Sequence, residues 1–278
     1  MIMVEIKGLT KKFENYIALD GFNLQVPKGS IYGLVGVNGS GKTTAIKHLA
    51  GVYKADTGAV EIGGERVYDN NEAKAKIGFV PDDMYFFPQY SLKALGRFYK
   101  NMYPVTWCDQ RFNELARLLE VDPKKRVTKF SKGKQKQVAL TLALSIKPEV
   151  LLLDEPIDGL DPIVRSQIFK WIIDDVASRQ MTVIISSHNL KEMDGICDRV
   201  GIIKEGKMLV ESDLDTLKAE MLAEFIDTGV PTLDEVFLHI YNAQENRYEV
   251  SSEGSVAGII SSGAAGVGAE PHLDGGVK

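Results

Sequence analysis

The stretch that decides the fold reads Gly36-Val37-Asn38-Gly39-Ser40-Gly41-Lys42-Thr43-Thr44, which has the G-x-x-x-x-G-K-[ST] spacing of a phosphate-binding loop. It follows the apolar run 31–35, which favours a buried strand, and it leads into residues 44–50, whose composition suits a helix. Glycines in such a loop let consecutive backbone N–H groups face a phosphate at the positive end of the helix. The sequence therefore predicts a nucleoside triphosphate site here.

The residue types in this loop indicate separate roles. Lys42 carries a mobile positive charge for the β- and γ-phosphates, and the Thr43 hydroxyl can ligate Mg²⁺. The other loop residues expected to cradle the nucleotide are Gly36, Asn38, Gly39, Ser40, Gly41 and Thr44.

Composition limits the classes of protein to which this chain can belong. The 278 residues suffice for one large α/β domain or for one domain with an appendage, and 44% hydrophobic with 26% charged content is ordinary for a globular protein. A net charge of −5 argues against nucleic acid as a primary partner. The two cysteines have no metal or redox spacing, which suits a reducing cytosol. No apolar stretch reaches the roughly 20 residues that span a bilayer, so a membrane role requires a partner.

Apolar runs and turn signals along the chain predict an α/β fold. Strands are expected at 4–6, 22–26, 31–35, 59–62, 77–80, 150–154 and 182–186, with a hairpin of 200–204 and 207–210 around the Glu205-Gly206 turn. Helices are expected at 92–102, 108–119, 132–146 after an N-cap at Ser131, and 161–179. We therefore expect a mixed, mainly parallel sheet with antiparallel N-terminal strands in a domain covering 1–210, and an α-helical subdomain inserted at about 84–147.

The C-terminal part has a different composition. Residues 211–250 are predicted to be a small helical appendage, with helices at 213–221 and 233–241. Residues 251–278 are rich in glycine, serine and alanine, so they bury too little apolar surface to offset the entropy of ordering. We expect a flexible tail there.

Two adjacent carboxylates end the fully apolar strand 150–154. Side chains alternate along a strand, so Asp154 and Glu155 point in opposite directions and can serve two roles. Asp154 is placed to bond the Mg²⁺ shell, and Glu155 is placed where an attacking water would lie.

A basic segment, Phe130-Ser131-Lys132-Gly133-Lys134-Gln135-Lys136-Gln137, precedes that strand. It resembles the Leu-Ser-Gly-Gly-Gln signature of the ABC-type ATPases, in which Ser131 and Gly133 match while Lys132 and Lys134 depart from the pattern. Gly159-Leu160-Asp161-Pro162 is similar to the D-loop of that family, and His188, just past strand 182–186, to its switch histidine. The resemblance covers roughly residues 3–240 and implies a P-loop NTPase core.

Two further positions of the family pattern are informative. Phe13 stands where the family places an aromatic ring on adenine, with Tyr16 as the neighbouring alternative. Asp82 replaces the usual Q-loop glutamine, which leaves its part in sensing Mg²⁺ and water open. Together with Ser-Lys-Gly in the signature, Asp82 resembles the antibiotic-export and resistance branch of bacterial ABC ATPases.

The resemblance implies an ATP-hydrolysing subunit of a membrane transporter, with an exporter favoured. Lys42, Glu155 and His188 would be catalytic. Mg²⁺ would be held by Thr43 and Asp154, with Asp82 as a further candidate. Ser131 and Gly133 would act on ATP bound by a second ATPase subunit, which is either identical to this chain or different from it. The other partner would be a separate transmembrane permease subunit that holds the protein on the inner face of the cell membrane, with no nucleic acid. The alternative is a soluble ABC ATPase acting on DNA or ribosomes, for which the basic run 124–136 is the supporting feature.

Aromatic residues concentrate in 85–107, where eight of them stand. They can fill the core of the helical insertion or line a groove for the transmembrane subunit. We assign Tyr85-Phe86-Phe87 to the partner, because a loop is the least natural place for core residues.

Overall fold

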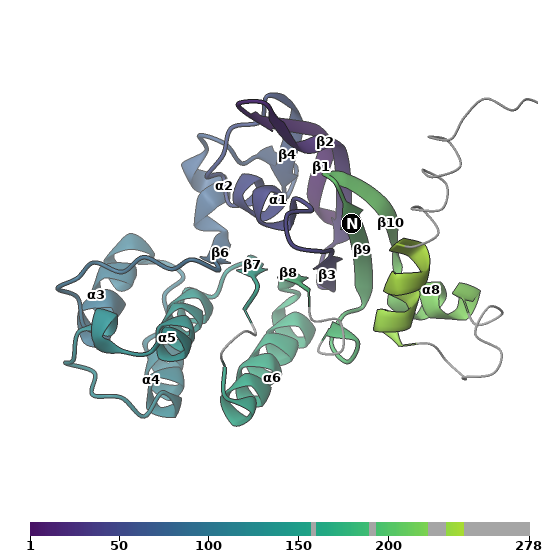
Figure 1. The fold of residues 1–278 in the computed structure, drawn as a ribbon. Helices are drawn as coiled ribbons and strands as arrows, with labels where there is room; N and C mark the ends of the chain where they lie inside the picture. The colour runs from purple at the N-terminus through teal and green to yellow at the C-terminus, as the bar shows by residue number, and fades with distance from the viewer. Residues whose placement is uncertain (157–159, 189–192, 222–231, 242–278) are drawn as a thin grey trace, which may run out of the picture. The chain divides into compact units, whose positions relative to one another are not determined.

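Two sheets carry the fold of the computed structural model (Figure 1). The larger has the strand order β10-β9-β3-β8-β7-β6, with β3 Ile31–Val35, β6 Ile77–Val80, β7 Val150–Asp154, β8 Thr182–Ser187, β9 Arg199–Lys204 and β10 Lys207–Asp213. Its pairs are parallel from β9 to β6, and β10 is antiparallel to β9. The smaller, antiparallel sheet has the order β2-β1-β4-β5, with β1 Ile2–Phe13, β2 Tyr16–Pro27, β4 Thr57–Ile62 and β5 Glu65–Arg66. The predicted α/β class with a mainly parallel sheet and N-terminal antiparallel strands is confirmed.

The structure describes residues 1–156, 160–188, 193–221 and 232–241. Residues 1–240 form one compact unit. The predicted flexible tail and Gly159 of the predicted D-loop lie outside the described residues. Within the described part of the chain, no helix is both long and apolar enough to cross a membrane.

Helix α1, Lys42–Leu49, packs between the two sheets. Its buried Ala45, Ile46 and Leu49 join one hydrophobic cluster with residues of both sheets. On β7, Val150 and Leu152 belong to this cluster, so the equally buried residues that alternate with them point to the opposite face. A strand buried on both faces explains why residues 150–153 are continuously apolar.

Helix α6, Pro162–Arg179, begins and ends with local signals. The Asp161 side chain caps it by accepting the backbone N–H of Ile163 at 2.9 Å. Gln180 ends the helix in the left-handed conformation, with a φ of 58°. Ile168 and Ile172 are buried.

Three helices, α3 Leu92–Met102, α4 Asp109–Leu118 and α5 Lys132–Ser145, occupy the segment predicted to be helical, with a 3₁₀ turn η1 at Val127–Lys129. They enclose a second hydrophobic cluster, made of Leu92, Leu95, Leu119, Val127, Val138 and Leu142. Ser91 caps α3 and Ser131 caps α5, each through its side-chain oxygen. Helix α2, Asn71–Ala75, was not predicted; it has five residues and is capped by Asn70.

The aromatic loop before α3 divides between interior and surface. Phe86 is partly buried and packs against the helical cluster together with Tyr90, Tyr99 and Trp107. Tyr85 and Phe87 are 81% and 46% exposed. The prediction that assigned all three adjacent rings to a partner therefore differs from the structure at Phe86. The rings on either side of Phe86 in the sequence are exposed, so this loop contributes one ring to the core and two to the surface.

The C-terminal helices are α8, Leu214–Met221, and a helix at 233–241. Leu214, Leu217, Leu233 and Val236 are buried. Strand β10 runs to Asp213, so the boundary expected at residue 210 falls inside a strand.

Candidate active site

The phosphate-binding loop joins the end of β3 to the start of α1, as predicted. Gly41 is the N-cap of α1 with a φ of 112°, and a Cβ there would lie 2.7 Å from the Ala18 carbonyl oxygen. Only glycine adopts this conformation in this space without strain. A cavity of about 410 Å³ opens beside the loop, lined by Asn38, Gly39, Gly41, Lys42, Thr43, Thr44, Tyr16, Ala18, Asp82 and Glu155.

The turn of the β9–β10 hairpin is hydrogen-bonded to the phosphate-binding loop. The Gly206 N–H donates to the Ser40 carbonyl at 2.8 Å, and the Asp20 N–H donates to the Gly206 carbonyl at 3.0 Å. Gly206 has a φ of 76°, and a Cβ would lie 2.7 Å from the Ala18 carbonyl oxygen. The loop is thus held between strands from both sheets.

Lys42 is almost fully buried beside the loop. Its ammonium donates to the carbonyls of Gly36 at 2.8 Å and Val37 at 3.2 Å. It also lies 3.4 Å from Glu155 Oε1. The lysine charge therefore lies between the loop backbone and the carboxylate that ends β7.

Asp154 and Thr43 form the second polar contact of the site. Asp154 Oδ1 accepts the Ser186 hydroxyl at 2.6 Å and the Thr43 hydroxyl at 3.1 Å. Burial raises the pKa of Asp154, the nearby charges of Glu155 and Asp82 raise it further, and the two hydroxyl donors oppose this.

Asp154 and Thr43 fit a divalent cation. The Asp154 Oδ2 atom is buried without a hydrogen-bond partner, and the Thr43 hydroxyl lies beside the same carboxylate. Hard oxygen donors of this kind suit Mg²⁺. Among the described residues, no group of three or more His, Cys, Asp or Glu side chains is arranged to hold a metal, so the phosphates of a bound nucleotide would have to supply further ligands.

Glu155 adopts an unusual backbone conformation, with a φ of 45°. This left-handed region costs a non-glycine residue roughly 1–2 kcal/mol, and such strain concentrates at functional positions. Glu155 Oε2 lies 2.9 Å from His188 Nδ1 and accepts the His188 backbone N–H at 3.3 Å. Strands β7 and β8 are parallel neighbours with Asp154 opposite Ser186, which brings 155 and 188 to the same edge of the sheet.

Tyr16, the alternative to Phe13, is the aromatic residue that lines the phosphate-loop cavity. Its hydroxyl donates to the Gly39 carbonyl at 3.1 Å. Phe13 is 39% exposed, packs edge-on against Tyr53 and has the Lys11 ammonium over its ring, outside the lining. Tyr16 therefore lines this cavity and Phe13 does not, and which of the two rings contacts adenine stays a prediction.

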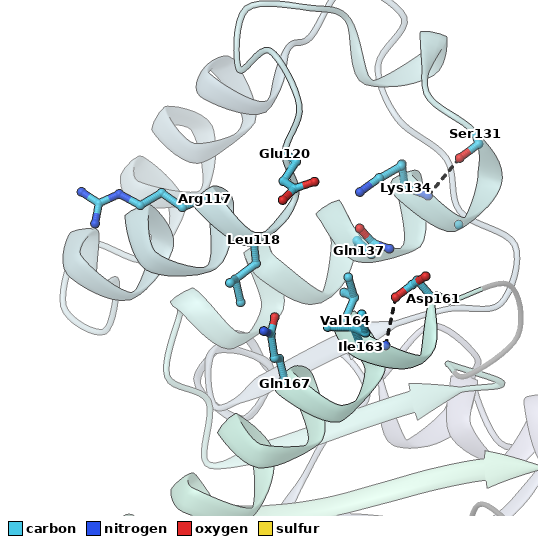
Figure 2. Close-up of a pocket in the computed structure, with 11 residues that line it drawn as sticks. Arg117, Leu118, Glu120, Ser131, Lys134, Gln137, Asp161, Ile163, Val164 and Gln167 are labelled. Carbon is cyan, nitrogen blue, oxygen red and sulfur yellow. Dashed lines mark hydrogen bonds between the residues drawn. The ribbon is translucent and has the colours of Figure 1, made fainter.

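Ser131 and Gly133 lie at a different place, a cavity of about 570 Å³ that they line together with Asp161 (Figure 2). In this view Gln137 of α5 lies over Ile163 and Val164 of α6, whereas the Lys134 side chain extends towards Glu120. The Ser131 hydroxyl accepts the Lys134 N–H at 3.4 Å. The structure does not bring Ser131 and Gly133 to the phosphate loop of their own chain.

Sequence reasoning missed two residues of the site. Ser186 bonds both Asp154 and the Glu155 N–H, and a polar residue ending the apolar strand 182–185 was the available signal. Lys136 donates to Glu155 and Asp82, and its spacing within a basic segment gave no sign of this.

A nucleotide-binding loop between β3 and α1, a strand ending in two carboxylates and a helical segment with its own core define a P-loop ATPase. The ABC transporter family model matches residues 19–158, and the chain belongs to this family. It is 32% identical over 223 residues to the ABC transporter ATP-binding protein YtrB of Bacillus subtilis, covering 79% of this chain and 75% of YtrB. It is 35% identical over 222 residues to the bacitracin transport ATP-binding protein BcrA of Bacillus licheniformis, covering 78% of this chain and 71% of BcrA.

Among solved structures, a dimeric ATP-binding cassette in a post-hydrolysis state with ADP and phosphate has a TM-score of 0.67 to this chain. The two are 24% identical, and the match covers 76% of this chain and 99% of the other. This likeness supports the cassette fold.

Proposed function

We propose that this chain hydrolyses ATP to drive an exporter whose membrane-spanning subunit is a separate protein. The observation that carries the proposal is the Glu155 carboxylate, which faces the phosphate-loop cavity between Lys42 at 3.4 Å and His188 at 2.9 Å. The likeness to BcrA, a bacitracin transport protein, supports a role in transport, and the outward direction is part of the proposal.

In this mechanism the residues position charges around the γ-phosphate. The loop N–H groups and Lys42 bind the phosphates, which draws the lysine ammonium away from Glu155. The freed Glu155 carboxylate orients a water molecule and accepts its proton, and His188 steadies that carboxylate or the phosphate. Thr43 and Asp154 would hold Mg²⁺, which would neutralise the charge that develops on the phosphate oxygens.

A second ATPase subunit would complete the site. Ser131 and Gly133 begin α5, where backbone N–H groups favour an anion, and they are remote from their own loop cavity. We infer that they act on the nucleotide of the partner subunit, with Asp161 beside them. The dimeric state of the similar solved cassette supports this arrangement.

The membrane-spanning subunit would dock on an aromatic patch that we define as Tyr85, Phe87, Phe98 and Met102. These side chains are between 37% and 81% exposed. The Phe87 ring lies 6.3 Å from Tyr85 and 6.2 Å from Phe98 between centroids, so they form one surface. Aromatic residues and methionine are enriched at interface cores. Docking there would place the protein on the inner face of the membrane.

The alternative function, action on DNA or ribosomes, has less support from the structure. Two lysines of the basic run 124–136 are used internally: Lys134 donates to the Leu119 carbonyl at 2.7 Å, and Lys136 is buried. Both ammonium groups are therefore used within the protein and do not serve to bind a nucleic acid.

The deciding experiment replaces Glu155 with glutamine. We expect ATP binding to persist, ATP turnover to fall by about 100-fold or more, and an ATP-dependent dimer to accumulate in size-exclusion chromatography. Glu149→Gln, at an exposed residue just before the same strand, is the matched control and should hydrolyse ATP normally. Normal turnover in Glu155→Gln would exclude Glu155 as the base.

A further inference from the structure

Lys136 links three parts of the site that are distant in sequence. It lies on α5, five residues after the Ser131 cap, and is 5% exposed. Its ammonium donates to the Glu155 carbonyl oxygen at 2.6 Å and to Asp82 Oδ1 at 3.3 Å. One buried charge thus joins α5, the end of β7 and the segment after β6.

Burying an ammonium is costly unless acceptors and an opposite charge compensate it. The shorter of the two bonds goes to a neutral carbonyl, and Asp82 supplies the opposite charge from a side chain that is 54% exposed. Because Asp82 remains in contact with water, removing Lys136 would not leave a buried unpaired carboxylate. The free-energy cost of burying the Lys136 ammonium therefore indicates that its bond to Glu155 has a function.

That function concerns the Glu155 backbone, whose φ of 45° is unfavourable for an L-residue. Ser186 holds one side by accepting the Glu155 N–H at 3.1 Å, and Lys136 holds the other side through the carbonyl. With both peptide groups fixed, the carboxylate is directed towards Lys42 and His188.

We propose that Lys136 is a positioning residue: it clamps the Glu155 carbonyl so that the carboxylate faces the phosphate loop, with Asp82 as its counter-ion. This rests on the proposed role of Glu155 as the base. Helix α5 begins at Ser131, which we infer acts on the nucleotide of the partner subunit. Lys136 on the same helix therefore connects this helix end to Glu155 of its own subunit. A shift of α5 on dimer formation would then change the orientation of Glu155.

The test measures the steady-state ATPase activity of the full chain for Lys136→Met and Lys136→Gln. Methionine keeps the length and apolar stem of lysine but donates no hydrogen bond, so kcat should fall about 10- to 100-fold. KM and the Kd for ATP should stay within about twofold, because the phosphate loop is untouched. Glutamine retains a donor for the carbonyl and should recover most of the lost kcat.

Two controls separate positioning from folding. Lys129→Met, at an exposed lysine of η1, should leave kcat unchanged. Asp82→Asn keeps the carbonyl clamp and should lower kcat less than Lys136→Met. If Lys136→Met does not fold, Lys136→Leu, which also donates no hydrogen bond, takes its place, and a kcat in Lys136→Leu equal to that in Lys136→Gln contradicts the clamp.

A normal kcat in Lys136→Met, or a loss confined to KM or to the melting temperature, would overturn the inference. Glu155→Gln distinguishes this from failure of the proposed function. If Glu155→Gln is inactive while Lys136→Met is normal, Glu155 is the base and needs no clamp from Lys136. If Glu155→Gln turns over normally, the proposed function itself fails.

Discussion

Replacing Asp175 with asparagine should destabilise the contact between α6 and α4. Asp175 is 2% exposed, and its carboxylate accepts both terminal nitrogens of Arg111, with Nη2 at 2.7 Å. Arg179, one turn further along α6, donates to the same carboxylate at 2.9 Å. Arg111 comes from α4, so this buried group connects the helical segment to the helix that follows β7.

The magnitude follows from burial and geometry. Breaking a buried ion pair costs roughly 3–5 kcal/mol, because the remaining charge loses its compensation. Arg111 is left with a side chain that is only 12% exposed, but asparagine keeps one acceptor oxygen for it. We therefore expect the free energy of unfolding to fall by about 3 kcal/mol at neutral pH.

The same contact predicts a pH dependence. Burial raises the pKa of Asp175, but hydrogen bonds and charges from Arg111 and Arg179 outweigh burial and hold the pKa below its ordinary value. A lowered pKa in the folded state gives stability that is present above the unfolded-chain pKa of about 3.9 and is lost as pH falls through the folded value. Asp175→Asn should lose this part of the acid dependence.

Urea denaturation followed by tryptophan fluorescence measures both effects, because the Arg111 guanidinium lies 4.9 Å from the Trp171 ring centre. Asp20→Asn is the matched control: Asp20 is 48% exposed and pairs with Lys207 at 3.1 Å, so the loss should stay below about 1 kcal/mol. A loss in Asp175→Asn as small as that in Asp20→Asn, or an unchanged acid profile, would refute the reasoning.

Two further substitutions test where aromatic residues act. Tyr16→Ala should weaken ATP binding by about tenfold, and more than Phe13→Ala does, because Tyr16 lines the loop cavity. Titration with a fluorescent ATP analogue measures both affinities. A larger loss in Phe13→Ala would identify Phe13 as the adenine contact. Phe86→Ser should lower the melting temperature, since the ring packs on the helical cluster, whereas Phe87→Ser should keep the melting temperature and lose co-purification with the membrane subunit. Equal falls in melting temperature would place both rings in the core.

Local signals in the sequence predicted much of the fold. Helix α3 begins and ends at the predicted residues, and α5 ends one residue before the predicted end. The loop 36–44 was predicted with its flanking strand and helix. Each of these features depends on residues a few positions apart, and caps, glycine turns and apolar runs act over that range. Strands β1 and β2 run twelve residues each, far beyond their predicted cores, because pairing continues through exposed polar positions.

Tertiary structure alone decided which distant residues meet. Lys136 bonds Asp82, 54 positions away, and the Glu155 carbonyl, 19 positions away, because β6 and β7 are neighbours and α5 packs beside β6. Gly206 reaches the phosphate loop because β9 pairs with β3. The sequence by itself determined that there is a nucleotide loop and a carboxylate pair. Strand order and packing, which depend on the whole chain, determined that a buried lysine bonds the backbone carbonyl of the second carboxylate residue.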